Sequence, residues 1–402
     1  MANVSSSNGL EKRPKLRFPG FDEPWQSTQL SSVFAKNTQK NTDGRITNVI
    51  CNSAKQGLIP QREYFDKDIA NNDNTNGYYI IEENDFVYNP RKSADAPYGP
   101  ISSYKYTEAG IVSPLYLCFR AKKEINPAFF EWYFRSSAWH RYVYMSGDSG
   151  ARHDRVSIKD DTFFAMPINI PSAHEQAKIA IFLERIEQRI EMQRALVESL
   201  KKYKRGVVSA ILSHQLTFSD AAGDPYPEWT TCSLQDAVDF LDGQRKPLES
   251  ADRAKRQGQY PYYGASGIID YIDDFIFDEP LLLLGEDGAN ILNRSTPLCF
   301  IAEGKYWVNN HAHVMRPKAG QNIKFLCELL ESLDYTRYNT GTAQPKLNQE
   351  KCRRIEIALP VYEEQCHIAD FLSALDQRAA KAQSILDYLR SNRDGLLQQF
   401  FI

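Results

Sequence analysis

The sequence is poor in the features that mark membrane, secreted and metal-framework proteins. Its seven cysteines, spread over 402 residues, never form a C-x-x-C pair, a usage typical of buried thiols in a reducing cytoplasm rather than of disulfides or zinc ligands. No stretch approaches the ~20 apolar residues of a membrane span, and residues 1–17 lack the apolar centre of a secretory signal. We therefore expect a cytoplasmic protein without a membrane segment.

The motifs of nucleotide-handling enzymes are also missing. There is no G-x-x-x-x-G-K-[ST] loop to hold a triphosphate, and no G-x-G-x-x-G follows a predicted strand. The Asn-Pro-Pro-aromatic loop that holds a flipped adenine is absent too, since Asn89-Pro90 is followed by Arg91. These absences argue against an NTPase and against a chain that methylates adenine by itself.

Two patterns could bind a metal, and both are weak. His311 and His313 would lie on one face of a strand, but no third ligand is identifiable, so we expect no metal site there. Asp287, Glu303 and Lys305 follow two predicted strands in an arrangement that nucleases use to hold Mg²⁺. A turn built on Gly285 and Gly288 explains these acidic residues more simply. A self-contained Mg²⁺-dependent nuclease is retained only as the alternative function.

A long internal repeat is the main positive feature of the sequence. Residues 171–212 and 360–401 align without a gap and share 11 identical residues in 42 positions, where chance would give about two or three. Trp25 and Leu30 are echoed by Trp229 and Leu234. The segment 150–157 is echoed by 341–348. The chain therefore consists of a globule and a helical segment, followed by a second globule and a second helical segment.

Each repeated segment has the apolar spacing of a long amphipathic helix. Apolar residues recur every three or four positions, with Gln193 and Asn392 as polar interruptions and Tyr203 and Phe371 in the expected seam. About 40 residues at 1.5 Å each would span roughly 60 Å. Matched length and phase favour antiparallel pairing of the two helices as a coiled coil. Packing of each helix into a separate bundle is the alternative.

The two globules have the pattern of mixed α/β (α+β) domains with short strands. Strand-like segments cover 77–81, 85–88 and 111–119 in the first globule, and 259–272, 281–284 and 298–302 in the second. Helical spacing predicts helices over 127–145 and 323–333. We expect five segments: a disordered extension (1–15), the first globule (16–165), the first helical spacer (166–215), the second globule (216–359) and the C-terminal helical region (360–402).

The net charge of −3 conceals an uneven distribution. Residues 1–165 carry 21 Lys and Arg against 19 Asp and Glu, whereas residues 217–359 carry 15 against 21. The basic residues cluster in polar, loop-like stretches, and such side chains grip phosphates and read base edges. For any single residue a solvated surface role is the simpler interpretation. As a set, the candidate DNA-binding residues are Lys36, Lys40, Arg45, Arg91, Lys92, Arg152, His153, Arg155, Gln244, Arg245, Lys246, Asn310, His311, His313, Gln344 and Lys346.

Over nearly its whole length, the chain resembles the specificity subunits of Type I restriction-modification systems. The likeness rests on the Trp25/Leu30 and Trp229/Leu234 openings, on the segment 344–348, and on the paired helices that begin Pro…Glu-Gln…Ile-Ala-x-Phe-Leu. The segments 285–289 and 310–314 also resemble a common version of the second recognition domain.

The resemblance implies a noncatalytic subunit in which each globule is a target-recognition domain that reads one half of a split DNA sequence. It also implies two methyltransferase subunits and, in the full complex, restriction subunits as partners. These partners would bring S-adenosylmethionine, ATP and Mg²⁺, and no cofactor would bind this chain. The residues expected in the coiled coil and in partner docking are Ile179, Phe182, Leu183, Ile186, Gln188, Arg189, Leu200, Ile368, Phe371, Leu372, Leu375, Gln377, Arg378 and Leu389.

Overall fold

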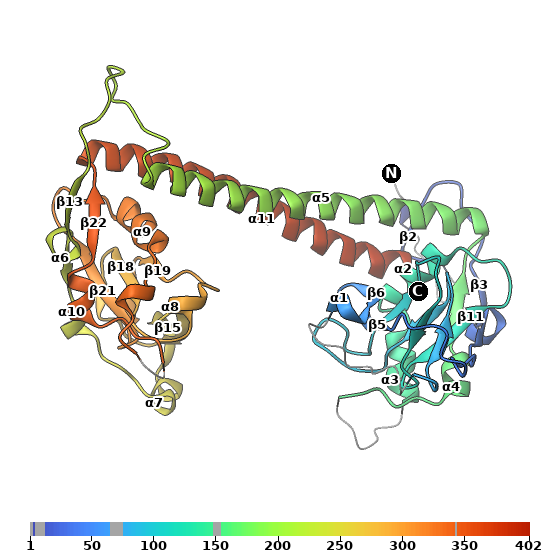
Figure 1. Cartoon of the computed structure of the whole chain (residues 1–402). Coiled ribbons are helices and arrows are strands. Elements are labelled where there is room, and N and C mark those ends of the chain that lie inside the picture. Colours follow the sequence, from blue (N-terminus) through green and yellow to red (C-terminus); the bar gives the residue numbers. More distant parts are fainter. Residues whose placement is uncertain (1–2, 5–12, 65–74, 148–153, 342–343) are drawn as a thin grey trace. The chain divides into compact units, whose positions relative to one another are not determined.

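The chain folds into two compact units, each of which contains one globule and parts of both long helices (Figure 1). A computed structural model describes residues 3–4, 13–64, 75–147, 154–341 and 344–402. The first unit comprises Met1–Arg194 with Ser384–Ile402, and the second comprises Ala195–Gln383. Within the described residues, no helix combines the length and the apolar character that crossing a membrane requires.

The first unit is built on a four-stranded antiparallel sheet. Its strand order is β4 (Phe34–Lys36), β11 (Leu117–Ala121), β8 (Phe86–Tyr88) and β9 (Ile101–Ser103). Smaller two-stranded pairings join β2 (Leu16–Arg17) to β1 (Asn3–Val4), β3 (Gln26–Gln29) to β12 (Pro167–Ile170), β5 (Ile50–Ser53) to β6 (Gly57–Pro60), and β7 (Tyr79–Ile81) to β10 (Gly110–Val112). The helical elements are η1 (Leu30–Ser32), α1 (Gln61–Tyr64), α2 (Pro127–Arg135), α3 (His140–Ser146) and α4 (Asp160–Phe164).

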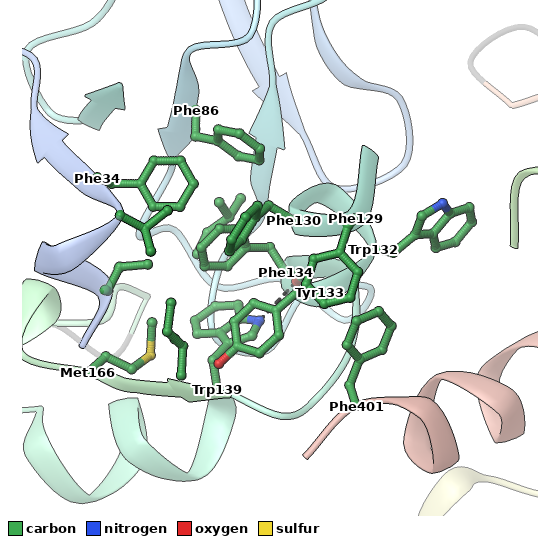
Figure 2. Packing of buried hydrophobic residues seen from close by; sticks show 14 of the residues in the cluster. Phe34, Phe86, Phe129, Phe130, Trp132, Tyr133, Phe134, Trp139, Met166 and Phe401 are labelled. Carbon is green, nitrogen blue, oxygen red and sulfur yellow. Dashed lines mark hydrogen bonds between the residues drawn. The ribbon is translucent and has the colours of Figure 1, made fainter. Parts of the chain in front are cut away.

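Both faces of this sheet are buried. Alternate residues of a strand point to opposite faces, so Phe86 and Phe119 join a large aromatic cluster with α2, while Val87 and Cys118 join a smaller cluster on the other face. Figure 2 shows the aromatic cluster, in which Phe34 packs edge-on against Phe86 and Phe130. Such buried rings supply most of the apolar area that stabilises this unit.

The predicted elements of the first globule are present, but two of them are divided. The helix predicted over 127–145 is interrupted after Arg135, where the Ser136 hydroxyl donates to the Tyr133 carbonyl and ends α2. The strand predicted over 111–119 is split into β10 and β11 by a turn. Of the extension expected to be disordered, residues 1–2 and 5–12 lie outside the described residues, and Asn3–Val4 pair with β2.

The second unit repeats the central sheet of the first. The strand order is β14 (Val238–Phe240), β21 (Ala312–Pro317), β18 (Leu281–Gly285) and β19 (Cys299–Ala302). A second sheet contains β16 (Gly267–Ile272), β15 (Gln257–Gly264), β20 (Lys305–Val308) and β17 (Phe277–Asp278), and β13 (Thr230–Ser233) pairs with β22 (Glu356–Leu359). The helical elements are α6 (Leu234–Ala237), η3 (Asp242–Gln244), α7 (Ser250–Lys255), α8 (Asn290–Asn293), α9 (Ile323–Ser332), η4 (Thr336–Tyr338) and α10 (Gln349–Arg353).

The equivalence of the two sheets extends to their register. In the first unit Phe119 lies between Lys36 and Phe86, and in the second Met315 lies between Phe240 and Leu282. The helix that follows β11 in the first unit and β21 in the second is capped by an asparagine, Asn126 before α2 and Asn322 before α9. The sequences of the two globules do not reveal that their sheets are alike, because many apolar residues can fill the same buried positions.

The two repeated segments form α5 (Ala173–Leu212) and α11 (Tyr362–Phe400). In the first unit the early part of α5 packs on the late part of α11, with Phe182 against Phe400 at 5.8 Å between ring centroids. In the second unit the late part of α5 meets the early part of α11, where Lys204 Nζ lies 2.7 Å from the Asp376 carboxylate. The predicted antiparallel pairing is therefore confirmed within each unit.

Two aromatic residues of the predicted seam are more exposed than a coiled-coil seam requires. Tyr203 is 57% exposed and Phe371 is 37% exposed, whereas the neighbouring seam residues Val207 and Leu372 are buried. A straight α-helix has 3.6 residues per turn rather than the 3.5 of a strict heptad, so the buried stripe drifts around the helix.

Candidate nucleic-acid interface

The same backbone pairing brings polar residues together in both units. In the first unit the amide of Lys92 donates to the carbonyl of Asp154, and the amide of Val156 donates to the carbonyl of Pro90, each at 2.8 Å. In the second unit Gly288 donates to Pro345 at 3.0 Å and Leu347 donates to Glu286 at 2.7 Å. In both units, the residues that follow the third strand of the sheet order (β8 or β18) pair with the echoed segment (150–157 or 341–348) that precedes a long helix (α5 or α11).

In the first unit this pairing gathers three of the predicted DNA-binding residues. Arg91 and Arg155 face each other in an isolated bridge, and Lys92 is the next residue. Arg91 and Lys92 are exposed, and Arg155 is half-buried with its Nε 3.8 Å from an Asp154 carboxylate oxygen. The predicted residues Arg152 and His153 lie outside the described residues. The first unit thus presents a basic edge next to its echoed segment.

The other candidates of the first unit lie on or after β4. Lys36 forms an ion pair with Asp160 of α4, and this hydrogen bond raises the pKa of the Lys36 ammonium. Lys40 forms an isolated bridge with Tyr79, and Arg45 is exposed beside Asp43. Lys40 and Arg45 are open to solvent, although the Arg45 Nε lies 2.9 Å from an Asp43 carboxylate oxygen.

In the second unit the equivalent pairing is rich in carboxylates, and cations neutralise them. Arg245 Nη1 donates to Glu286 at 2.8 Å and to the Ala312 carbonyl at 2.7 Å. The Lys346 ammonium lies 3.4 Å from the other oxygen of Glu286. The guanidinium of Arg245 is only 13% exposed, while Lys346 is half exposed. Arg245 therefore supports the edge from within, and Lys346 is open to a ligand.

Asp242 is the second acidic centre of this network. Its carboxylate accepts hydrogen bonds from the amide of Val314 at 2.9 Å, from Gln349 Nε2 at 2.7 Å and from His313 Nδ1 at 2.7 Å. Burial raises the pKa of Asp242, but the hydrogen bond and charge of His313 outweigh burial, and the net pKa is lowered. Asp242 is thus an ionised anchor inside the domain.

The placement of His313 corrects one of the sequence predictions. Its side chain has no exposed surface, and its two ring nitrogens contact Asp242 and the Leu347 carbonyl. A side chain enclosed in this way cannot contact a base. The prediction that His313 contacts DNA directly is therefore wrong. His311, by contrast, is exposed and lies with Nδ1 2.8 Å from Asp287.

The two histidines, which the sequence left only as weak candidate metal ligands, do not face one common site. Each imidazole bonds to a different aspartate, His311 to Asp287 and His313 to Asp242. Among the described residues, Asp242, Glu286 and His313 do come close enough to surround an ion. Their ligand atoms are already held by Arg245, Lys346 and Gln349. The positive charges of Arg245 and Lys346 lie beside these carboxylates, where a bound metal ion would otherwise supply positive charge.

The structure contradicts the nuclease arrangement of Asp287, Glu303 and Lys305. Strands β18 and β19 are antiparallel, with Leu284 opposite Cys299 and Leu281 opposite Ala302. The paired part of the hairpin, from Leu281 to Leu284, is about 10 Å long at ~3.3 Å per residue, and Asp287 and Glu303 lie beyond its opposite ends. Lys305 lies 4.0 Å from Asp278 instead. Residues at opposite ends of a hairpin cannot share one metal ion.

The remaining candidates of the second unit surround the network on exposed positions. Gln244 ends η3, Lys246 follows it, Asn310 lies in the turn before β21, and Gln344 is the first described residue of the echoed segment after 342–343. Sequence reasoning did not select Asp242, Glu286 or Gln349. The signal that could have found them is their position directly after a buried strand or directly beside the echoed segment.

The residues expected in the long helices fall into two groups. Apolar members are buried or half-buried in the packing between the helices or against a globule, apart from Phe371. Gln188, Arg189, Gln377 and Arg378 are exposed. These four are identical between the two copies, although the fold does not bury them.

Comparison with known proteins identifies the family. The family model for the Type I restriction modification DNA specificity domain matches residues 22–202 and again 226–387. A putative type I restriction enzyme specificity subunit of Haemophilus influenzae is 34% identical over 149 residues, which is 37% of this chain and 37% of that protein. The EcoprrI specificity subunit of Escherichia coli is 28% identical over 125 residues, 31% of this chain and 30% of its own length. These alignments span well under half of the curated relatives.

Solved structures share the fold over nearly the whole chain. A chain from a structure of type I R-M complex assembly has a TM-score of 0.61 at 15% identity and covers 95% of this chain and 98% of its own. The type I restriction-modification S subunit from M. genitalium has a TM-score of 0.55 at 16% identity, covering 97% and 99%. With two matches to the family model in one duplicated fold, the chain belongs to the Type I restriction-modification DNA specificity domain family.

Proposed function

We propose that this chain is the noncatalytic DNA-specificity and assembly subunit of a Type I restriction-modification complex, and that each globule reads one half of a bipartite DNA target. The observation that carries the proposal is the duplicated pairing at 90–92 with 154–156 and at 286–288 with 345–347. The same backbone frame presents Arg91, Lys92 and Arg155 in one unit and His311 and Lys346 in the other. A shared frame with different side chains suits two domains that read different bases.

Electrostatics support contact with the phosphate backbone at these edges. In the first unit the exposed side chains next to the pairing are mainly cationic, and such contacts dominate affinity for DNA. In the second unit Glu286 and Asp287 absorb part of the positive charge, so fewer cations remain free for phosphates. The second domain would therefore rely more on polar contacts, and on positive charge from partner subunits.

The long helices would dock two methyltransferase subunits, one per repeat. Gln188-Arg189 and Gln377-Arg378 are exposed and identical in the two copies, and a duplicated surface suits two copies of one partner. S-adenosylmethionine, ATP and Mg²⁺ would enter through the methyltransferase and restriction subunits. The predicted recognition domains, 16–165 and 216–359, and a cytoplasmic location belong to this proposal.

Exchanging one globule tests the proposal. Replacing residues 17–165 with the corresponding segment of a family member should change one half of the methylated target and leave the other half intact. Mapping N6-methyladenine across the genome in cells that carry either chain measures both halves at once. Exchange of 230–359 is the matched control and should change the other half. A change of both halves by either exchange, or of neither half by both, would contradict the assignment of one half-site to each globule.

A further inference from the structure

A buried histidine holds the echoed segment of the second unit in place. His313 Nδ1 lies 2.7 Å from the Asp242 carboxylate on η3, and Nε2 lies 2.9 Å from the carbonyl of Leu347. Leu347 in turn donates its amide to the Glu286 carbonyl. One imidazole thus ties β21 to η3 and to the segment that carries Gln344 and Lys346.

The partners of the ring determine its charge. A carboxylate and a backbone carbonyl only accept hydrogen bonds, so both ring nitrogens must carry a proton for both bonds to form. Burial lowers the pKa of His313, but hydrogen bonds and charge interactions with Asp242 and with Cys352 of α10 raise the net pKa to about 10. The ring is an imidazolium at neutral pH, and its charge is matched by Asp242 and by Glu286 at 3.8 Å.

The echoed segment is held by further bonds from the same network. Gln349 at the start of α10 donates to Asp242, and Lys346 is paired with Glu286, which Arg245 also contacts. Glu286, the carboxylate paired with Lys346, therefore lies in the same network as the His313–Asp242 pair, while Asn339 and Thr340 hold the backbone of Lys346 separately. Removing the imidazolium would leave the Asp242 carboxylate buried with one donor fewer and would free the Leu347 carbonyl.

The described part of the first unit has no histidine at the position of this clamp. In the register of the two sheets, His313 is opposite Leu284, and Leu117 is opposite Tyr88. Leu117 therefore occupies the position that corresponds to His313. Pro90 likewise corresponds to Glu286, since each lies two residues after those strand partners. Among the described residues, the clamp therefore occurs in the second unit and not in the first.

We propose that His313 is a positioning residue: as an imidazolium between Asp242 and the Leu347 carbonyl, it fixes the segment that bears Gln344 and Lys346 and so sets discrimination at the half of the DNA target that the second domain reads. This inference rests on the function proposed above. His313 acts through these residues and does not touch the DNA.

The test uses the full complex, assembled from this chain and its methyltransferase subunits. Methylation rates are measured on duplexes that carry single base changes in either half of the target. His313→Leu should lower discrimination at the half read by the second domain about tenfold, the size of one lost base contact, and should leave discrimination at the other half unchanged. Gln349→Leu removes one donor to Asp242 and should produce a smaller loss at the same half.

A control in the same strand separates positioning from general destabilisation. Met315 is fully buried on β21, so Met315→Ala weakens the same sheet and leaves the His313 contacts in place. Equal loss from Met315→Ala and His313→Leu, unchanged discrimination in His313→Leu, or loss at both halves would overturn the inference. If His313→Leu does not fold, His313→Gln and Gln349→Leu decide the question in the same assay. A wild-type complex that shows no discrimination at all would instead overturn the proposed function.

Discussion

At the scale of single residues, the candidate interface depends on which charges are satisfied inside the domain and which remain open to solvent. Arg245 and His313 were both selected as DNA contacts because basic and polar side chains clustered in loops. The structure shows Arg245 engaged with Glu286 and with a backbone carbonyl, and His313 fully enclosed. Sequence proximity to a loop does not tell whether a cation points outward or neutralises a carboxylate that folding brings beside it.

The charge of His313 predicts a pH-dependent contribution to stability. Its pKa in the folded chain is raised above the unfolded value of 6.5 to about 10. Its contribution is therefore fully present below about pH 6.5 and is lost as pH rises through about 10. We expect the difference in unfolding free energy between wild type and His313→Gln to narrow from pH 6.5 to pH 10. Urea unfolding at several pH values measures it.

His140 of the first unit provides a control of opposite sign. Burial lowers the pKa of His140, so its contribution is lost as pH falls below 6.5 rather than as pH rises. The difference in unfolding free energy between wild type and His140→Gln should therefore change below pH 6.5. A His313→Gln difference that stays constant from pH 6.5 to pH 10 would show that His313 is not charged in the folded chain.

At the scale of secondary-structure elements, the two long helices begin alike but are anchored differently. Glu175 in the first turn of α5 accepts two hydrogen bonds from Arg17, at 2.8 and 2.7 Å. Glu364, its counterpart in α11, is equally buried, and its Oε2 has no hydrogen-bond partner. Phe18 packs on Phe182 as Phe218 packs on Phe371, which places Thr217 where the first copy has Arg17. The described part of the second copy therefore has no arginine at this place.

This difference predicts opposite outcomes for the same substitution in the two copies. Glu175→Gln leaves Arg17 buried beside a neutral amide and should destabilise the first unit by about 3 kcal/mol. Burial raises the pKa of Glu364, although Trp229 and nearby histidines oppose the shift. Glu364→Gln removes the charge of a buried carboxylate whose Oε2 has no hydrogen-bond partner and should be neutral or stabilising at pH 7. Thermal unfolding of both variants measures the contrast, and equal destabilisation would refute it.

Much of the element pattern could be predicted, and the failures have physical causes. Helix 323–332, strand 281–285 and both long helices follow from apolar periodicity. The division of 127–145 into two helices depends on Ser136 and on the burial of Trp139, whose indole donates to the Phe134 carbonyl. Such bonds form only once the tertiary fold brings the partners together. Periodicity alone cannot report them.

At the scale of the whole molecule, duplication determines what the chain offers to partners. Each unit exposes one copy of the Gln-Arg pair, Gln188-Arg189 or Gln377-Arg378. Identical exposed residues in two copies of a helix that otherwise differ at most positions point to a shared binding role rather than to folding. This is the surface at which we expect the methyltransferase subunits to bind.

Charge reversal tests this surface. Arg189→Glu should reduce the stoichiometry of bound methyltransferase subunits from two towards one, and Arg378→Glu should do the same for the other copy. The double variant should bind neither, as measured by native mass spectrometry of the assembled complex. Lys202 is also exposed on α5 but has Ser391 as its counterpart, so Lys202→Glu is the matched control. Full assembly of the double variant would show that these arginines do not contact the partner.

The sequence by itself determined the duplication, the antiparallel helices and the mixed α/β globules. These features depend on the spacing of apolar residues and on the identical residues shared by the two repeated segments. It also located the echoed segments 150–157 and 341–348. Only the tertiary structure decided that both globules share one strand order in their central sheets. It also decided that each echoed segment pairs with the residues that follow the third strand of that order. It also separated the exposed Lys346 from the enclosed His313. That distinction depends on hydrogen bonds between residues far apart in sequence, which no local pattern records.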